Sequence, residues 1–300
     1  MCLLAAGLLL AAAVARAAEP IGVITELHVA NGQVDVKPAA GGDWQAAKPL
    51  LSINEGDQVR AAGAARAVLV FVGNQRSTVV TPANSPFVAA PPVQPGIGER
   101  LKGAIGYLQS TSMSRKATLT VRSSREVSPI VLLAPRETLV AADAVAFVWE
   151  GPDAARYTVR LVSADRVLWE AKSVGGRRLA PPPDVRLAPG RYRWELEGTG
   201  YGIHRAAFDV ARPEITDQVR AAVAAVEDAG YPPVTAALLK AAELMRERFY
   251  ADARRELLRA MTASPEEPTL HQLLSEVYDK TGLENLAAGE QSRADALSGR

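Results

Sequence analysis

Histidine, the side chain best suited to metal binding and to proton transfer near neutral pH, occurs three times in the chain. The sequence predicts His28 in a strand, His204 in a glycine-rich loop and His271 on a helix, each in a different domain. A shared metal site, or a nucleophile–histidine–carboxylate set, would require these domains to converge on one point. We therefore predict no catalytic residue, no cofactor and no metal site.

Short motifs with a known chemistry are absent from the sequence or incomplete. There is no Walker loop, no His-Glu-x-x-His and no Gly-x-Ser-x-Gly. The segment GIGERL, residues 96–101, begins like a dinucleotide-binding fingerprint, but Leu101 occupies the place of the third glycine. Acidic pairs such as Glu266 and Glu267 flank predicted helix ends, which indicates capping or solvated charge. The sequence thus predicts a protein that is not an enzyme.

The composition is typical of a chain that buries hydrophobic cores. Of its 300 residues, 48% are hydrophobic and 22% are charged, and the length suits two or three domains. The net charge of +1 supplies no field that would attract nucleic acid or anionic lipid. We expect no nucleic-acid partner.

Residues 1–17 have the layout of a secretory signal peptide. Residues 2–15 are apolar, and Ala15-Arg16-Ala17 offers a cleavage site between small residues. The apolar run is shorter than the roughly 20 residues that span a bilayer. We expect a periplasmic or otherwise exported mature chain with no membrane span and, because Cys2 leaves with the signal, no disulfide. No basic residue precedes the run, so the signal is atypical or the true start lies upstream; a buried N-terminal helix is the alternative.

The sequence predicts an all-β domain over residues 20–91, because short segments with alternating apolar residues are separated by glycine-rich turns. The segment GQVDVKP (32–38) alternates, and RAVLVFV (66–72) places Ala67, Leu69 and Phe71 on one face.

This domain resembles the FecR-like periplasmic domain, whose signature is a Gly-Asp-x-Val-Arg turn followed by a strand that ends near Phe. The matching residues are Gly56, Asp57, Val59, Arg60 and Phe71. Ala61 departs from the Thr that the family usually has, and Gly73-Asn74 replaces its common Asp-Gly turn. The resemblance implies a fold and a compartment. The signalling role of FecR itself would require an anti-sigma segment upstream of Met1. Read from the residues alone, Gly56, Asp57 and Arg60 indicate a turn with a local hydrogen bond or ion pair.

Residues 92–127 predict a linker, because prolines at 91, 92 and 95 interrupt regular structure. Within it Leu101, Ile105 and Leu108 recur at helical spacing, which predicts a short amphipathic helix over 99–108.

Residues 128–211 predict a β-sandwich with a hairpin at Ala164-Asp165. Trp-x-Gly-Pro (149–152), Tyr-x-Val-x-Leu (157–161) and Leu-x-Pro-Gly-x-Tyr-x-Trp (187–194) resemble fibronectin-III/Ig-like modules. Alternation points the aromatic rings inward, so we expect them to pack in the core; the alternative is a carbohydrate-stacking platform. The rings are those of Trp149, Trp169, Tyr192 and Trp194.

After Pro213 the hydrophobic period changes from 2 to 3.6, and residues 213–298 predict helices at about 214–229, 234–248, 250–262, 268–280 and 284–297. The 34-residue interval is the tetratricopeptide period, and the segment resembles that repeat. Small residues at this interval let paired helices approach closely. The residues that match the repeat are Ala241, Ala253, Ala260, Pro265, Leu274, Tyr278, Gly282, Ala287 and Ala294. Lys240 departs from the pattern, where an apolar residue is expected.

The sequence therefore predicts a multi-domain β + α protein, with two all-β domains followed by a helical array of about two and a half repeats. So short an array should lean on the sandwich or on a second protein. We expect a non-enzymatic cell-envelope scaffold or sensor that binds a protein partner through the repeats. The alternatives are a periplasmic glycan- or ligand-binding module in contact with the cell wall, and a FecR-type regulator with an upstream start.

Overall fold

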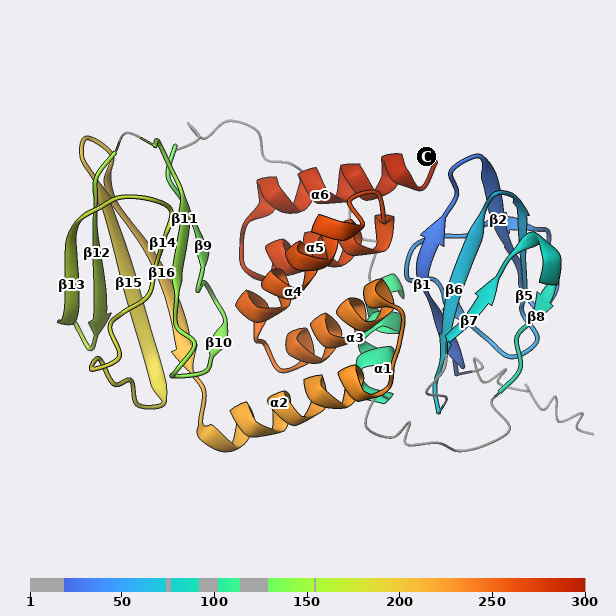
Figure 1. The fold of residues 1–300 in the computed structure, drawn as a ribbon, viewed down its shortest axis with the longest axis horizontal. Helices are drawn as coiled ribbons and strands as arrows, with labels where there is room; N and C mark the ends of the chain where they lie inside the picture. The colour runs from blue at the N-terminus through green and yellow to red at the C-terminus, as the bar shows by residue number, and fades with distance from the viewer. Residues whose placement is uncertain (1–18, 74–76, 92–101, 114–128, 154, 300) are drawn as a thin grey trace, which may run out of the picture.

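The computed structural model describes residues 19–73, 77–91, 102–113, 129–153 and 155–299 (Figure 1). The predicted signal peptide and most of the predicted linker lie outside the described residues. Along the chain, β-sheets precede the C-terminal helices, so the predicted order of β followed by α is confirmed. In space, the helices lie between the two β regions (Figure 1).

The described part of residues 20–91 forms two four-stranded sheets, ordered β4–β1–β6–β7 and β3–β2–β5–β8. Its elements are β1 (Gly22–His28), β2 (Gly32–Lys37), β3 (Gln45–Ala46), β4 (Ser52–Ile53), β5 (Gln58–Gly63), β6 (Arg66–Phe71), β7 (Ser77–Val80), a 3₁₀ turn (Pro82–Asn84) and β8 (Phe87–Val88). Ile24 and Leu69 of the first sheet share one apolar core with Val34 and Val59 of the second. The alternating pattern of these strands thus buries one face of each sheet against the other.

The described part of residues 129–211 forms a five-stranded sheet, ordered β10–β16–β15–β12–β13, and a three-stranded sheet, ordered β14–β11–β9. The strands are β9 (Val131–Ala134), β10 (Leu139–Val140), β11 (Phe147–Glu150), β12 (Tyr157–Ser163), β13 (Arg166–Val174), β14 (Arg178–Leu179), β15 (Gly190–Gly198) and β16 (Gly202–Val210). The rings of Phe147 and Trp194, from opposite sheets, have centroids 5.0 Å apart. The two sheets therefore face each other across one core.

The four aromatic rings that the sequence pattern points inward lie in the core or against it rather than on an open platform. Trp149 and Trp194 have no exposed surface, and Tyr192 is buried. Trp169 is half-buried and stacks on Phe147, with the ring centroids 6.2 Å apart.

The helices that follow are α2 (Pro213–Asp228), α3 (Pro233–Arg246), α4 (Tyr250–Ala263), α5 (Pro268–Lys280) and α6 (Glu284–Leu297). Their ends fall within two residues of the predicted ranges. Prolines begin α2, α3 and α5 at the first helical position, where a missing N–H leaves no helical bond unmade. Consecutive helices pack against each other, and α3 also contacts α5.

The helix in the predicted linker, α1 (Lys102–Met113), packs against α3 and β1. The predicted end at Leu108 is wrong, because the buried face continues through Gln109 and Thr111. Ile105 and Leu108 are buried with the helices, as their spacing indicates, whereas Leu101 lies outside the described residues. The side-chain amide of Gln109 donates to the carbonyls of Pro20 and Gly22, at 3.2 and 3.1 Å. This helix therefore joins the first β region to the helical array.

One apolar cluster fills the helical array and reaches into both β regions. It includes Val23 and Val70 of the first β region, Leu238 and Leu274 of the array, and Leu133 of the second β region. The array thus packs against both β regions of its own chain.

Candidate functional site

The polar residues of the FecR-like motif have local structural partners. Gly56 has a φ of +80°, a conformation that L side chains rarely adopt. The buried Asp57 carboxylate accepts hydrogen bonds from the backbone N–H groups of Ala39 and Asn54, at 2.9 and 2.8 Å. These bonds hold the turn before β5.

Arg60 of the same motif pairs with Asp35 on the neighbouring strand β2, with Nε 2.9 Å from Oδ2. Its guanidinium lies over the ring of Trp44. Val59 and Phe71 are buried in the core of the first β region. The motif therefore makes a turn, an ion pair and core packing rather than an open site.

Most of the residues that match the helical repeat are buried. Those with no exposed surface are Ala241, Ala253, Leu274 and Ala287, and Ala294 and Tyr278 have almost none. Ala260 is half-buried, and Pro265 is exposed after the end of α4. Gly282, with a φ of +69°, makes the turn between α5 and α6.

Lys240 replaces an expected apolar contact with ion pairs. Its ammonium lies 3.1 Å from a carboxylate oxygen of Glu227 on α2 and 3.2 Å from one of Glu256 on α4. Burial alone would lower the pKa of this lysine, but the two carboxylates outweigh it and raise the pKa.

The face of the array formed by α3 and α5 is covered by the chain itself. Both helices contact β1, and α1 packs against α3. Tyr107 of α1 donates a hydrogen bond to Glu276 of α5 at 2.9 Å, and burial with this carboxylate raises the pKa of the phenol. The face nearest the first β region therefore binds strand and helix of the same chain.

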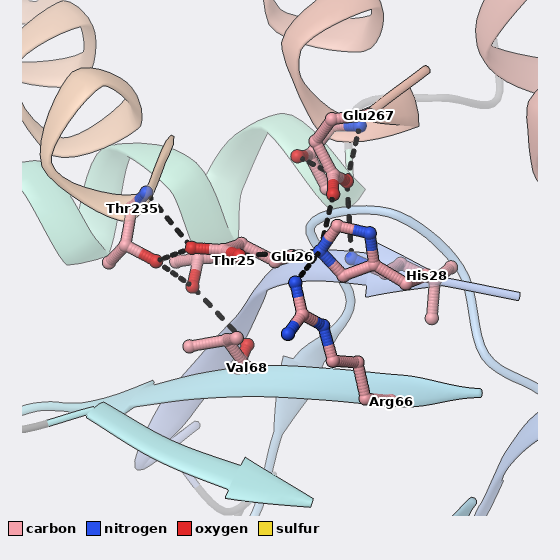
Figure 2. A network of polar contacts seen from close by, with 9 residues as sticks. Thr25, Glu26, His28, Arg66, Val68, Thr235 and Glu267 are labelled. Carbon is pink, nitrogen blue, oxygen red and sulfur yellow. Dashed lines mark hydrogen bonds and ion pairs between the residues drawn. The ribbon is translucent and has the colours of Figure 1, made fainter. Parts of the chain in front are cut away.

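A cluster of polar side chains lies where β1 meets the N-terminal ends of α3 and α5 (Figure 2). We call it the strand–helix junction. It consists of Thr25, Glu26, His28, Arg66, Thr235 and Glu267.

A β-bulge in β1 turns two adjacent side chains toward the helices. The pairing with β6 passes from Ile24 opposite Leu69 to Glu26 opposite Val68, so Thr25 is an extra residue. In a bulge, two successive residues face one partner, which breaks the strict alternation of a strand. Thr25 and Glu26 can therefore both reach Thr235 of α3 (Figure 2).

Glu26 caps the N-terminus of α3 from outside the helix. Its Oε1 accepts from the backbone N–H of Thr235 at 3.2 Å and from the Thr235 hydroxyl at 2.7 Å. The helix has no side-chain cap of its own. Burial acts to raise the pKa of Glu26, but hydrogen bonds with His28 and Thr235 outweigh it and hold the pKa below its ordinary value. Glu26 is therefore a buried carboxylate in its charged form.

Glu267 is the N-cap of α5 and its side chain has no exposed surface. Oε1 accepts from the backbone N–H groups of Thr269, at 3.3 Å, and Leu27, at 3.1 Å. Oε2 is buried, and no group in the described residues makes a hydrogen bond to it. Burial, which outweighs the attraction of His28, raises the pKa of this carboxyl. The predicted capping is observed, but the charge is buried rather than solvated.

The ring nitrogen Nε2 of His28 lies at the centre of the junction. It is 3.4 Å from Glu26 Oε2, 3.4 Å from Glu267 Oε2 and 3.3 Å from Nη2 of Arg66. Hydrogen bonds to charged groups are usually about 2.7–2.9 Å long. A single ring nitrogen carries one proton or one lone pair, so it cannot satisfy all three neighbours. Glu26, His28 and Glu267 offer ligand atoms that all lie within 4.8 Å of one another.

The other two histidines lie elsewhere. His204 is in strand β16, so its prediction in a loop is wrong; the strand continues because it pairs along β15. His271 of α5 contacts Glu290 of α6, with Nδ1 2.6 Å from Oε2. The sequence did not predict that the fold brings His28 to Glu267, a carboxylate from the array.

One sequence signal could have indicated part of the junction. Glu26 and His28 are two residues apart in a strand, which places their side chains on one face. Glu267 gives no such signal, because its approach to β1 depends on the packing of the array against the first β region.

In the described ranges of the chain, no helix is both long and apolar enough to cross a membrane. A comparison with models of known protein families gave no match, and a comparison with curated proteins found no similar sequence. The FecR-like, fibronectin-III/Ig-like and tetratricopeptide-like resemblances therefore serve as grounds for a proposal of function.

Proposed function

We propose that the protein is a non-enzymatic, exported cell-envelope protein that acts as a protein–protein interaction scaffold or sensor. Its parts in this role are a FecR-like β domain, a fibronectin-III/Ig-like sandwich and a tetratricopeptide-like array. The observation that carries the proposal is the helical array held between two β regions, with small residues buried where its helices meet.

The close packing of the array favours a structural role. Ala253 and Ala287, 34 residues apart, have no exposed surface, and side chains of this size allow helix backbones to approach closely. Close-packed protein interiors are stiff. A stiff array can hold attached domains and a bound partner in a fixed geometry.

A protein partner binds to the outer surface of the array in this proposal. The face formed by α3 and α5 is covered by β1 and α1, whereas α4 presents charged side chains to solvent, with Arg259 68% exposed. We define the outer surface as the exposed side of α2, α4 and α6.

Site-specific photo-crosslinking in cells tests this assignment. A photoreactive residue at Arg259 on the outer surface should capture a distinct envelope protein. The matched control position is Asp165, whose side chain is 90% exposed in the β12–β13 turn of the sandwich. Capture at position 165 but not at 259 would contradict the assignment. Single positions are preferable to deletion of the array, because deletion would uncover the buried face of β1.

Glycan binding through the second β region is the alternative that an observation favours. Tyr201 and Ile203, at the β15–β16 turn, are 40% and 42% exposed. Exposed apolar side chains of this kind mark binding sites for other molecules when they gather. A glycan-binding protein should sediment with purified cell wall, and Tyr201→Ala should weaken sedimentation while crosslinking at position 259 stays absent.

A further inference from the structure

We propose that the strand–helix junction binds a first-row divalent metal ion, with Zn²⁺ as the best match. The ligands are Oε2 of Glu26, Nε2 of His28 and Oε2 of Glu267 (Figure 2). A bound ion would link the first β region to the helical array.

The spacing of the ligand atoms fits a tetrahedral ion. Zinc bonds to nitrogen and carboxylate oxygen are about 2.0–2.2 Å long, and two such bonds at a tetrahedral angle separate their donor atoms by roughly 3.3–3.6 Å. His28 Nε2 is 3.4 Å from the carboxylate oxygen of Glu26 and 3.4 Å from that of Glu267. These two separations are long for hydrogen bonds and suited to ligands of one ion, and the oxygens of Glu26 and Glu267 lie within 4.8 Å of each other.

An unsatisfied buried oxygen points independently to a ligand. Glu267 has no exposed side-chain surface, and its Oε2 makes no hydrogen bond within the described part of the chain although it points toward His28 (Figure 2). A buried carboxylate oxygen without a partner loses its hydration without compensation. A cation bound between Glu26, His28 and Glu267 supplies that compensation.

The donor set selects among ions. One imidazole with two carboxylates suits zinc and its first-row neighbours, whereas calcium takes six to eight oxygens and magnesium keeps an octahedral shell. Three protein ligands leave the fourth tetrahedral position for water. Magnesium and calcium should therefore bind far more weakly than zinc.

Arg66 opposes the metal and regulates access to it. Its guanidinium nitrogen is 3.3 Å from His28 Nε2, yet the residue is exposed and can turn outward. The side chain of His28 is 34% exposed, which gives an entry path from solvent. Removing the positive charge of Arg66 should strengthen metal binding.

The ion would connect elements that are far apart in sequence. Glu26 and His28 belong to β1, and Glu267 caps α5. The other carboxylate oxygen of Glu26, Oε1, caps α3. Binding to the folded arrangement alone stabilises it by mass action. The metal thus stabilises the contact between the first β region and the array.

The experiment measures Zn²⁺ binding to the full chain after removal of metal with EDTA. Isothermal titration with ZnCl₂ should show one ion per chain, and MgCl₂ and CaCl₂ should give no comparable binding. Loss of a hydrogen-bond partner behind a ligand typically costs about 10- to 100-fold in affinity, so His28→Gln and Glu267→Gln, which remove ligands, should each cost at least that. His204→Gln, outside the junction, is the matched control and should bind like the unaltered chain.

The variant Arg66→Gln tests the same proposal even if a ligand variant folds poorly. It changes an exposed residue and should bind Zn²⁺ more tightly, with a larger rise of melting temperature on zinc addition. The proposal is overturned if the unaltered chain binds no Zn²⁺, if His28→Gln binds as tightly, or if Arg66→Gln binds no more tightly.

Discussion

The two β regions hold the helical array by different chemistry. At the strand–helix junction, the buried carboxylate of Glu26 caps α3. At the opposite side, the hydroxyl of Thr138, next to β10, accepts from the N–H of Ala251 at 3.3 Å and caps the N-terminus of α4. Neither helix has a side-chain cap of its own. The same structural task, supplying an acceptor to a helix end from another domain, is done once by a charged group and once by a neutral one.

We call the second contact the sandwich–helix junction, formed by residues 136–139 with Arg248, Ala251 and Thr281. Its bonds run to backbone groups: the N–H of Leu139 donates to the carbonyl of Arg248 at 2.9 Å, and Arg136 Nε donates to the carbonyl of Thr281 at 2.6 Å. Backbone partners do not titrate. One attachment of the array should therefore respond to cations, and the other should be insensitive to them.

The largest effect should come from Glu267→Ala. The change leaves the buried N–H groups of Leu27 and Thr269 without their acceptor, at about 1–3 kcal/mol each, and removal of the unpaired Oε2 offsets part of this loss. The free energy of unfolding should therefore fall by about 3 kcal/mol. Urea unfolding in EDTA measures this loss without bound metal. The exposed neighbour provides the control, because Glu266→Ala should change stability by less than about 0.5 kcal/mol. Equal losses of stability in both variants would contradict the role of Glu267 as a buried acceptor for these N–H groups.

At the sandwich–helix junction, Thr138→Val should cost about 2 kcal/mol, because an isosteric methyl leaves the N–H of Ala251 without its cap and the carbonyl of Arg248 with one donor fewer. The loss should be the same with EDTA and with ZnCl₂. Thr262→Val, at the exposed end of α4, is the control and should be nearly neutral. A loss that zinc reverses would show that the two junctions are not independent.

A histidine–carboxylate pair inside the array, away from both junctions, should make the free energy of unfolding depend on pH. His271 contacts Glu290, and its Nε2 donates to the carbonyl of Pro265 at 2.8 Å. The bond with Glu290 raises the pKa of His271 above its ordinary 6.5, against burial and the like charge of Arg293. The stabilisation is therefore fully present below pH 6.5 and is lost as pH rises through the raised value.

We expect His271→Gln to cost about 1.5 kcal/mol at pH 5.5, the lower end of the range for a hydrogen bond to a charged group, and clearly less at pH 9. Urea unfolding at the two pH values measures the difference, with His204→Gln as the control. A cost that grows with pH would contradict the sign of the pKa shift.

The regular elements could be predicted from the sequence, because each is determined by nearby residues. The helices carry a 3.6 period with proline at the start of α3 and α5, and the strands of the sandwich alternate. Strand β1 has no such alternation, since both of its faces are buried: Ile24 points into the β core, and Val23 packs with the helices. In a strand of this kind, the sequence gives little indication of which face packs in the β core and which packs against the helices.

The strand–helix junction could not be predicted for a related reason. Its residues meet only because a bulge at Thr25 turns two side chains the same way and because the array packs against β1. The sequence also marked Glu267 correctly as a helix cap, but capping by itself does not indicate burial against another domain. The resemblance to a repeat similarly predicts which helices pair, and it does not predict that the chain covers the face of α3 and α5.

The smallest effect should come from Arg136→Met, the charged contact of the sandwich–helix junction. Its guanidinium binds the carbonyl of Thr281 at the C-terminal end of α5, where a positive charge also favours the helix dipole. Such a contact is worth about 0.3–1 kcal/mol at a half-exposed position, and methionine keeps the apolar stem of the side chain. Thermal unfolding at low and high salt measures it, with Arg186→Met in an exposed loop as the control. A loss near that of Glu267→Ala would mean that charge, rather than burial of an unsatisfied backbone group, decides the strength of both junctions. A small loss leaves burial as the cause, because Arg136 remains in contact with water and Glu267 does not.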